Sequence, residues 1–244
     1  DTIARWVDGG ATRGDPADLP PLREWPSGER WRLADLLGRP PDHLVQSAPW
    51  TQPAEGADQW WQPVVDSGLA EERWIKAIEA RPTPEGRRIV HHGNARELGE
   101  YAVGKPGQLY ADNMGMRMRA GMRVRFDIHY HSVGEEITAQ TELGVWFHPK
   151  GYVPKYRVYA SALGVQQSMA TLDIPPGKVT MHHAYIPLRA PVRLENYQPH
   201  MHIRGKAMSM EAILPNGQVQ MLSHVGNFDF NWHVNYVYTD DSAP

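Results

Sequence analysis

The chain has 244 residues, 41% hydrophobic and 22% charged, and a formal net charge of −3. That length allows one large domain or two modest ones, and the composition is that of an ordinary globular protein. The slightly acidic charge argues against a dedicated nucleic-acid binder, and no apolar run approaches the length of a membrane span.

Residues 1–30 are expected to form a short helical turn and a linker. Gly9 and Gly10 end the turn, and a Pro-rich connector follows. The chain opens at Asp1 without an initiator Met or a signal peptide, and it ends without an obvious terminus. We therefore expect a piece of a longer protein, with residues 1–30 as the tail of a preceding domain.

From Trp31 onward the sequence predicts short β-strands and few helices, because Pro and Gly repeatedly break the apolar runs. The clearest strand lies in 115–132, where Val124, Phe126, Ile128 and Tyr130 alternate with polar residues. Residues 69–82 fit either a helix or a strand. Further strands are predicted within 31–68, 87–94, 141–149, 155–161, 180–188, 192–205, 206–225 and 230–238.

These strands indicate an all-β fold made of one β-sandwich or a pair of them. Asn216-Gly217 predicts a tight hairpin turn inside 206–225, since this dipeptide tolerates positive φ.

The ligand-type residues are unusual, with 12 His and 10 Met but no Cys. Imidazole and thioether without thiolate suit copper better than a structural zinc or an iron–sulfur cluster. The lack of Cys also removes disulfides, and it leaves the redox compartment open.

Two histidine pairs have the spacing of strand neighbours that point the same way: His129/His131 and His200/His202. Such residues are roughly 6.5–7 Å apart along a strand, so their rings can converge on one metal ion. Adjacent histidines, at 91/92 and 182/183, point to opposite faces unless the backbone bends or bulges. The ordinary alternative for each pair is a set of polar surface positions.

The remaining histidines and the methionines have simpler interpretations. Solitary histidines default to structural roles: His43, His148, His224 and His233. Methionines in alternating strand positions are assigned to core packing: Met114, Met116, Met118 and Met122. Met208 and Met210 share a strand face and are also assigned to the core, with a soft metal ligand as the alternative.

Taken in order, HH before a strand, then HYH, then HMHIRGK resembles the type II copper, ascorbate-dependent monooxygenases, the family of peptidylglycine α-hydroxylating and dopamine β-monooxygenases. The likeness covers roughly 31–244 and is closest to a bacterial branch in which a c-type cytochrome domain precedes the copper module. It implies two antiparallel, jelly-roll-like β-sandwich domains, at 31–172 and 173–244, the second incomplete. Residues 1–30 would be the tail and linker of a cytochrome c-like domain, although no CxxCH haem motif lies within the chain.

The resemblance also implies two mononuclear copper sites. An electron-transfer copper would be held by His91, His92 and His129, with His131 outside the ligand set. A catalytic copper would be held by His200, His202 and a methionine from a later segment that this chain lacks. Asp127 and Asn196 share strand parity with nearby ligands and are candidates to orient them, or else solvated polar positions.

The implied reaction is hydroxylation of a C–H bond of a small organic substrate with O₂, one oxygen atom entering the substrate and the other leaving as water. Two electrons would come from ascorbate, another external reductant or a cytochrome c domain, in the periplasm or outside the cell. Peptide-amidating members carry an Arg where this chain has Gln198, which cannot form a bidentate charged pair with a peptide carboxylate. The alternatives are a non-catalytic copper electron-transfer or accessory subunit associated with a cytochrome c, and a β-sandwich interaction module with vestigial histidines.

Overall fold

The structure is a computed structural model that describes residues 2–21, 30–102, 105, 107–160, 172–230, 234–239 and 241–244. The chain divides into two compact units, Asp1–Arg30 and Trp31–Pro244. None of the helices in these described ranges has the length and apolar character needed to cross a membrane.

The first unit contains the predicted helical turn, α1 (Thr2–Asp8), followed by the 3₁₀ turn η1 (Pro16–Asp18). The helix ends at Gly9 and Gly10, and Gly10 takes the positive φ of 91° that follows many helix ends. The Asp15 side chain accepts the Ala17 N–H and so starts η1. The assignment of this unit to the tail of a preceding domain stays a prediction.

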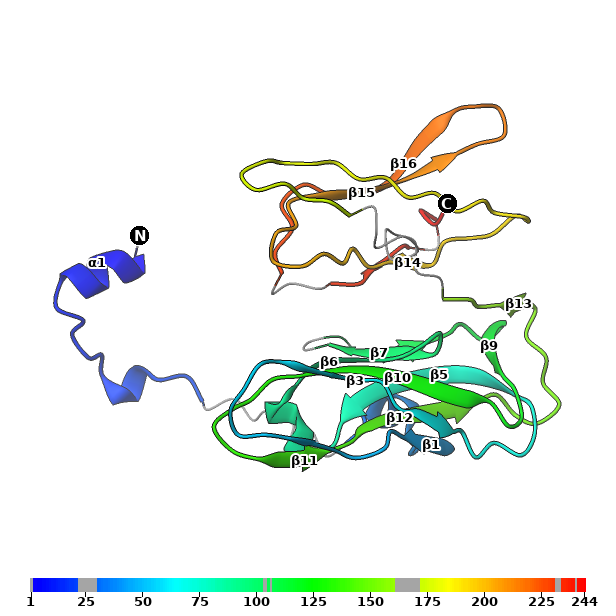
Figure 1. The fold of residues 1–244 in the computed structure, drawn as a ribbon, viewed down its shortest axis with the longest axis horizontal. Coiled ribbons are helices and arrows are strands. Elements are labelled where there is room, and N and C mark those ends of the chain that lie inside the picture. Colours follow the sequence, from blue (N-terminus) through cyan, green and yellow to red (C-terminus); the bar gives the residue numbers. More distant parts are fainter. Residues whose placement is uncertain are drawn as a thin grey trace. The chain divides into compact units, whose positions relative to one another are not determined.

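The second unit begins with two sheets, whose strands lie between His43 and Arg157 (Figure 1). One sheet has the order β1–β12–β5–β9–β13, with β8 also paired to β5, and the other has the order β3–β10–β6–β7, with β4 also paired to β10. A small β2–β11 pair completes this part. The strands are β1 (His43–Gln46), β2 (Trp50–Gln52), β3 (Gln59–Trp61), β4 (Val64–Asp66), β5 (Arg73–Pro82), β6 (Val90–Ala95), β7 (Gly99–Ala102), β8 (Gln108–Leu109), β9 (Met114–Met118), β10 (Arg123–Tyr130), β11 (Ile137–Ala139), β12 (Thr141–Phe147) and β13 (Tyr156–Arg157).

These two sheets enclose one apolar core, so this part is a β-sandwich. Phe126 and Ile128 of β10 are fully buried, as are Ile75 of β5 and Leu143 of β12 from the opposing sheet. All seven residues of β12 are buried because that strand lies between β1 and β5 with both faces covered. The predicted all-β fold is confirmed.

Two further predictions can be compared with this sandwich. The alternation expected in 115–132 is present in β10, where Val124, Phe126, Ile128 and Tyr130 are buried. The segment 69–82, left open between helix and strand, contains strand β5, because its side chains fill the core and its backbone pairs with β12, β8 and β9.

Two short helical elements were not expected: α2 (Arg32–Leu37) and η2 (Glu85–Arg88). The start of α2 is stabilised by strand β5, because the buried Glu79 carboxylate of that strand accepts hydrogen bonds from the N–H groups of Arg32 and Leu33. Gly38 ends α2 with a φ of 68°. Local sequence contains no sign of this capping contact.

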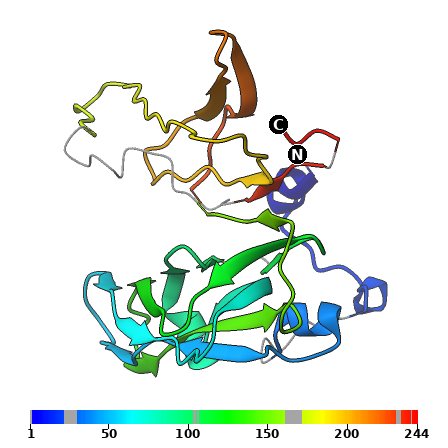
Figure 2. The ribbon, with the colours of Figure 1, turned by 90° about the vertical axis from the view of Figure 1, so that its right-hand side faces the viewer.

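The part of the unit after residue 172 contains little regular structure. Its strands are β14 (Asn196–Tyr197), β15 (Met208–Ile213), β16 (Val219–Val225) and β17 (Tyr236–Val237). β14 pairs with β17, and β15 pairs with β16 in the predicted hairpin, visible in orange and brown in Figure 2. Its turn includes Gly217 at a φ of 84°.

Several strands predicted in this region are wrong or too long. Residues 180–188 form no strand, and only 196–197 of the predicted 192–205 do. Many of the apolar side chains here are exposed, including Met181 and Tyr185, so the packing that would select strands from these alternating patterns is missing. The predicted second sandwich, and its boundary at residue 173, stay predictions.

Candidate metal centre

Three side chains stand in a row across neighbouring strands β3, β10 and β6. His129 of β10 is directly opposite Trp60 on one side and His92 on the other. Residues directly opposite one another in a sheet project from the same face. The partners in the next row, Ile128 and Trp61, point into the core instead, so the histidines lie on the face away from the core.

His91 joins this row through a β-bulge. The register pairs His129 with His92 but the next residue, Tyr130, with Val90, so His91 is the extra residue in β6. A bulge re-aims one side chain, which is how two adjacent histidines reach the same face. The glycine that follows the two histidines, Gly93, does not produce this irregularity, since it has no positive φ and pairs regularly with Ile128.

The three rings are close enough to share one ion. One nitrogen from each of His91, His92 and His129 lies within 4.8 Å of the other two, and each pair of ring centroids is 5.2 Å apart. Imidazole nitrogens bind metals at about 2 Å, so two ligands of one ion lie at most about 4 Å apart. Small ring rotations therefore suffice to close the site. Within the described part of the chain, these three residues form the only group of three or more metal-binding side chains found.

The nitrogens of the cluster are arranged in a way that a metal ion would complete. Nδ1 of His91 lies 3.0 Å from Nδ1 of His92, and two imidazole lone pairs at that distance repel unless a proton or a cation lies between them. Nδ1 of His129 is buried and has no hydrogen-bond partner among the described residues. Leaving a buried polar atom unpaired costs about 1–3 kcal/mol, which a metal bond would remove.

Electrostatics favour a neutral ring at His92. Burial lowers the pKa of His92 to about 4, with further lowering by the charges of His129, His91 and His200 and a small opposing effect of Glu100. A ring that stays unprotonated keeps a lone pair for a metal. Neutral imidazoles without any thiolate fit copper, although they do not exclude other divalent ions.

His200 and His202 lie beside this cluster and not apart from it. Their ring centroids are 5.3 Å apart, and the ring of His200 is 6.4 Å from that of His92. Phe230 stacks on His91 at 5.8 Å and meets His202 edge-on at 6.2 Å. Met208 and Met210, the alternative soft ligands, lie in β15 opposite Val225 and Ser223.

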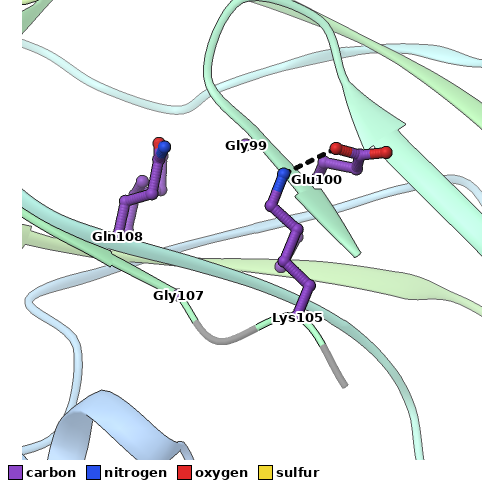
Figure 3. Close-up of a pocket in the computed structure, with 7 residues that line it drawn as sticks. Gly99, Glu100, Lys105, Gly107 and Gln108 are labelled. Atoms are coloured by element: carbon purple, nitrogen blue, oxygen red, sulfur yellow. Dashed lines mark hydrogen bonds and ion pairs between the residues drawn. The ribbon is translucent and has the colours of Figure 1, made fainter. Parts of the chain in front are cut away.

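The segment before His200 is tied to strand β7 by a hydrogen-bonded bridge. Lys105 Nζ donates to Glu100 Oε2 and to Gln198 Oε1, both at 2.6 Å, and Gln198 Nε2 donates to the same Glu100 oxygen at 3.1 Å. Figure 3 shows the Glu100–Lys105 part of the bridge beside a cavity of about 10 Å³. A cavity of that size holds at most a water molecule, so it is no substrate site.

The other predicted residues lie outside the cluster or at its margin. The ring of His131 is 6.4 Å from that of His91. Asp127 pairs with Arg96 at 3.3 Å, and Asn196 pairs with Val237 in β14–β17; no described hydrogen bond links either to a histidine. His182 contacts Thr180, and His183 stacks near Tyr185. His43 and His148 bond to the backbone carbonyls of Ser67 and Met114, a structural use, whereas His233 lies outside the described residues.

Two residues next to the cluster were missed by the sequence interpretation. Asp58 accepts a hydrogen bond from His129 Nε2 at 2.7 Å. Trp60 lies parallel to the His129 ring, with centroids 4.3 Å apart and 6° between planes. The two residues are spaced by two, which is the strand signal for a shared face, but only the register of β3 with β10 connects that face to the histidines.

Comparison with known proteins finds no match from which a role could be carried over to the site. No protein-family model matches the chain, and no curated protein matches it.

Proposed function

We propose that the chain binds a copper ion at His91, His92 and His129 and acts in a copper-dependent monooxygenase. The observation that carries the proposal is the convergence of three imidazoles at a bulge, with a buried, unpaired nitrogen on His129. Bound copper would supply one-electron chemistry between Cu(I) and Cu(II) and the activation of O₂. The order of the histidine motifs supports the monooxygenase class.

The residues divide the work in this proposal. His91, His92 and His129 would hold an electron-transfer copper, and His200 and His202 would contribute, with a methionine, to a catalytic copper. The reaction inserts one oxygen atom of O₂ into a C–H bond, and two electrons and two protons reduce the other to water. The donor is ascorbate, another external reductant or a cytochrome c domain, and the setting is periplasmic or secreted.

The contacts of Gln198 bear on the substrate class. Both ends of its amide are bonded, Oε1 to Lys105 and Nε2 to Glu100. These bonds hold the Gln198 amide against Lys105 and Glu100 and leave at most one N–H for a substrate, and the side chain also lacks the guanidinium charge. We propose a small organic substrate without a peptide carboxylate as its anchor.

A second candidate, a copper electron-transfer or accessory protein, is favoured by one observation. The group of three metal-binding side chains found among the described residues is His91, His92 and His129, and it does not include His200 or His202. A complete electron-transfer site beside an incomplete catalytic one is what a carrier would need.

Copper stoichiometry and oxygen uptake on the purified full-length protein distinguish the two candidates. Two coppers per chain, with O₂ consumed when reductant and substrate are supplied, support the monooxygenase. In that case His202→Ala should stop turnover while the first copper is still reduced. One copper that exchanges electrons without O₂ uptake supports the carrier, and no bound copper would exclude both.

A further inference from the structure

We propose that Asp58 is a positioning residue of the metal centre. Its carboxylate accepts a hydrogen bond from the Nε2–H of His129. The proton therefore stays on Nε2, and Nδ1 of that ring is the nitrogen that binds the metal. The inference rests on the proposed copper site and deepens it, because it assigns a ligating atom and a residue outside the histidine set.

Asp58 and His129 are joined by a short hydrogen bond between their side chains. His129 Nε2 lies 2.7 Å from Asp58 Oδ2. An ionised carboxylate can only accept, so Nε2 must be the donor and must carry the ring proton. In a neutral imidazole the other nitrogen, Nδ1, then has a free lone pair.

The position of Nδ1 completes the argument. This atom is buried and has no hydrogen-bond partner among the described residues, whereas the ring lies 5.2 Å from both His91 and His92. Nε2 is already engaged by Asp58 on the outer side, where the carboxyl side chain is 56% exposed. The donor nitrogen of the ring is therefore occupied by Asp58, and the buried Nδ1, with its lone pair, is the nitrogen left for a metal ion.

Trp60 holds the plane of the same ring. Its indole stacks on His129 and meets His92 edge-on, with centroids 5.3 Å apart and 68° between planes. A flat contact on one face and a hydrogen bond at one edge limit the rotation of an imidazole about its side-chain bonds. Asp58 and Trp60 thus orient His129 from two directions.

The alternative is an ordinary surface contact between an acid and a histidine. Exposed pairs of this kind contribute little to stability and have no reason to select a ring nitrogen. The two interpretations differ in what they predict for the proton of His129, and this proton can be observed without any metal.

The test measures the His129 tautomer and the copper affinity in three proteins. Long-range ¹H–¹⁵N NMR of the metal-free chain, with His129→Gln to assign the signal, should show His129 as the Nε2–H tautomer. Asp58→Ala should give a mixture of tautomers, and Asp58→Asn, which keeps an acceptor oxygen without the charge, should stay closer to the wild type. Cu(I) affinity, measured by competition with a chelator, should fall by about 10- to 100-fold in Asp58→Ala and less in Asp58→Asn.

Glu55→Ala provides the matched control, because it removes an exposed carboxylate only three residues away. It should leave the tautomer and the Cu(I) affinity unchanged. In the Cu(I)-loaded wild type, the ¹⁵N signal of His129 Nδ1 should shift strongly while that of Nε2 keeps its proton.

Failure of this inference can be told from failure of the proposed function. If the wild type binds copper but Asp58→Ala changes neither the tautomer nor the affinity, the role of Asp58 is wrong and the copper site stands. Binding through Nε2 of His129 would overturn the inference in the same way. If the wild type binds no copper, the proposed function itself fails.

Discussion

His129 and His131 can be compared directly, because they are two positions apart but His129 lies within β10 and His131 follows the end of that strand at Tyr130. We expect His129→Ala to reduce copper at the first site to background, since one of three ligands is lost. His131→Ala should keep the metal, because its ring stands 6.4 Å from His91 and outside the cluster. Copper per chain after dialysis, measured by atomic absorption, checks both variants.

The opposite pattern, in which copper survives His129→Ala and is lost with His131→Ala, would show that the ligand from this segment is His131 and not His129.

The burial of His92 predicts how the metal-free protein responds to acid. Because its pKa is lowered to about 4, the folded state stays neutral while the unfolded chain takes up a proton below the ordinary value of 6.5. The unfolded state binds more protons in this window, so stability falls as the pH drops from 6.5 to 4 and levels off below. At about 1.4 kcal/mol per pKa unit, the upper bound of the loss is about 3.5 kcal/mol, and solvent screening of this partly exposed ring makes it smaller.

Urea unfolding between pH 7 and pH 4 measures this loss. His92→Gln should flatten the profile in that window, because the amide does not titrate. A profile that is equally steep in both proteins would assign the acid sensitivity to other groups.

At the scale of a single strand, β10 has two separate tasks on its two faces. Phe126 is fully buried on the core face, whereas Arg125 on the other face is exposed and bonded to Gln62. We expect Phe126→Ala to lower the free energy of unfolding by about 3–5 kcal/mol. Arg125→Ala should cost less than about 1 kcal/mol.

Chemical unfolding gives these values, and copper binding to the folded fraction gives the complementary one. Because Phe126 lies on the face opposite His129, its truncation should lower stability far more than it lowers copper affinity. Equal losses in both would mean that the two faces are not independent.

Strand β10 also shows what sequence alone can predict. Its alternation is visible because the core face is strictly apolar, so the side on which His129 lies could be read before the fold was known. The bulge at His91 could be anticipated as a requirement, since adjacent histidines need one, but its place in the register could not. The positions of Asp58 and Trp60 beside His129 could not be predicted, because cross-strand pairing is set by contacts distant in sequence.

The failures after residue 172 have a different physical origin. Segment 180–188 alternates like a strand, but alternation selects a strand only where one face is buried against something. Met181 and Tyr185 are largely exposed, so these apolar side chains do not gain the burial that would stabilise an extended strand here. The hairpin at 208–225 was predictable because its turn chemistry is local.

At the scale of the whole second unit, the Glu100–Lys105–Gln198 bridge connects the sandwich to the segment that carries His200. We expect Gln198→Ala to speed backbone hydrogen exchange in 196–202 by about 5- to 100-fold, matching the roughly 1–3 kcal/mol of lost bonds and unpaired groups. Exchange in β10 and β12 should not change. Hydrogen–deuterium exchange with mass spectrometry resolves these segments.

Gln218→Ala is the control of the same type, since Gln218 bonds to Asn216 within its own hairpin turn. It should leave 196–202 untouched. If both variants, or neither, loosen that segment, the bridge does not hold it.

The extra residue in β6 has a consequence for how such a centre can arise. Without His91, Val90 would precede His92 directly, and the ladder against Tyr130 and His129 would run without interruption. A shortened chain lacking only that residue should therefore keep its sandwich but retain two of the three imidazoles. One added codon, at a place where the sheet tolerates a bulge, turns a pair of facing histidines into a candidate tridentate site.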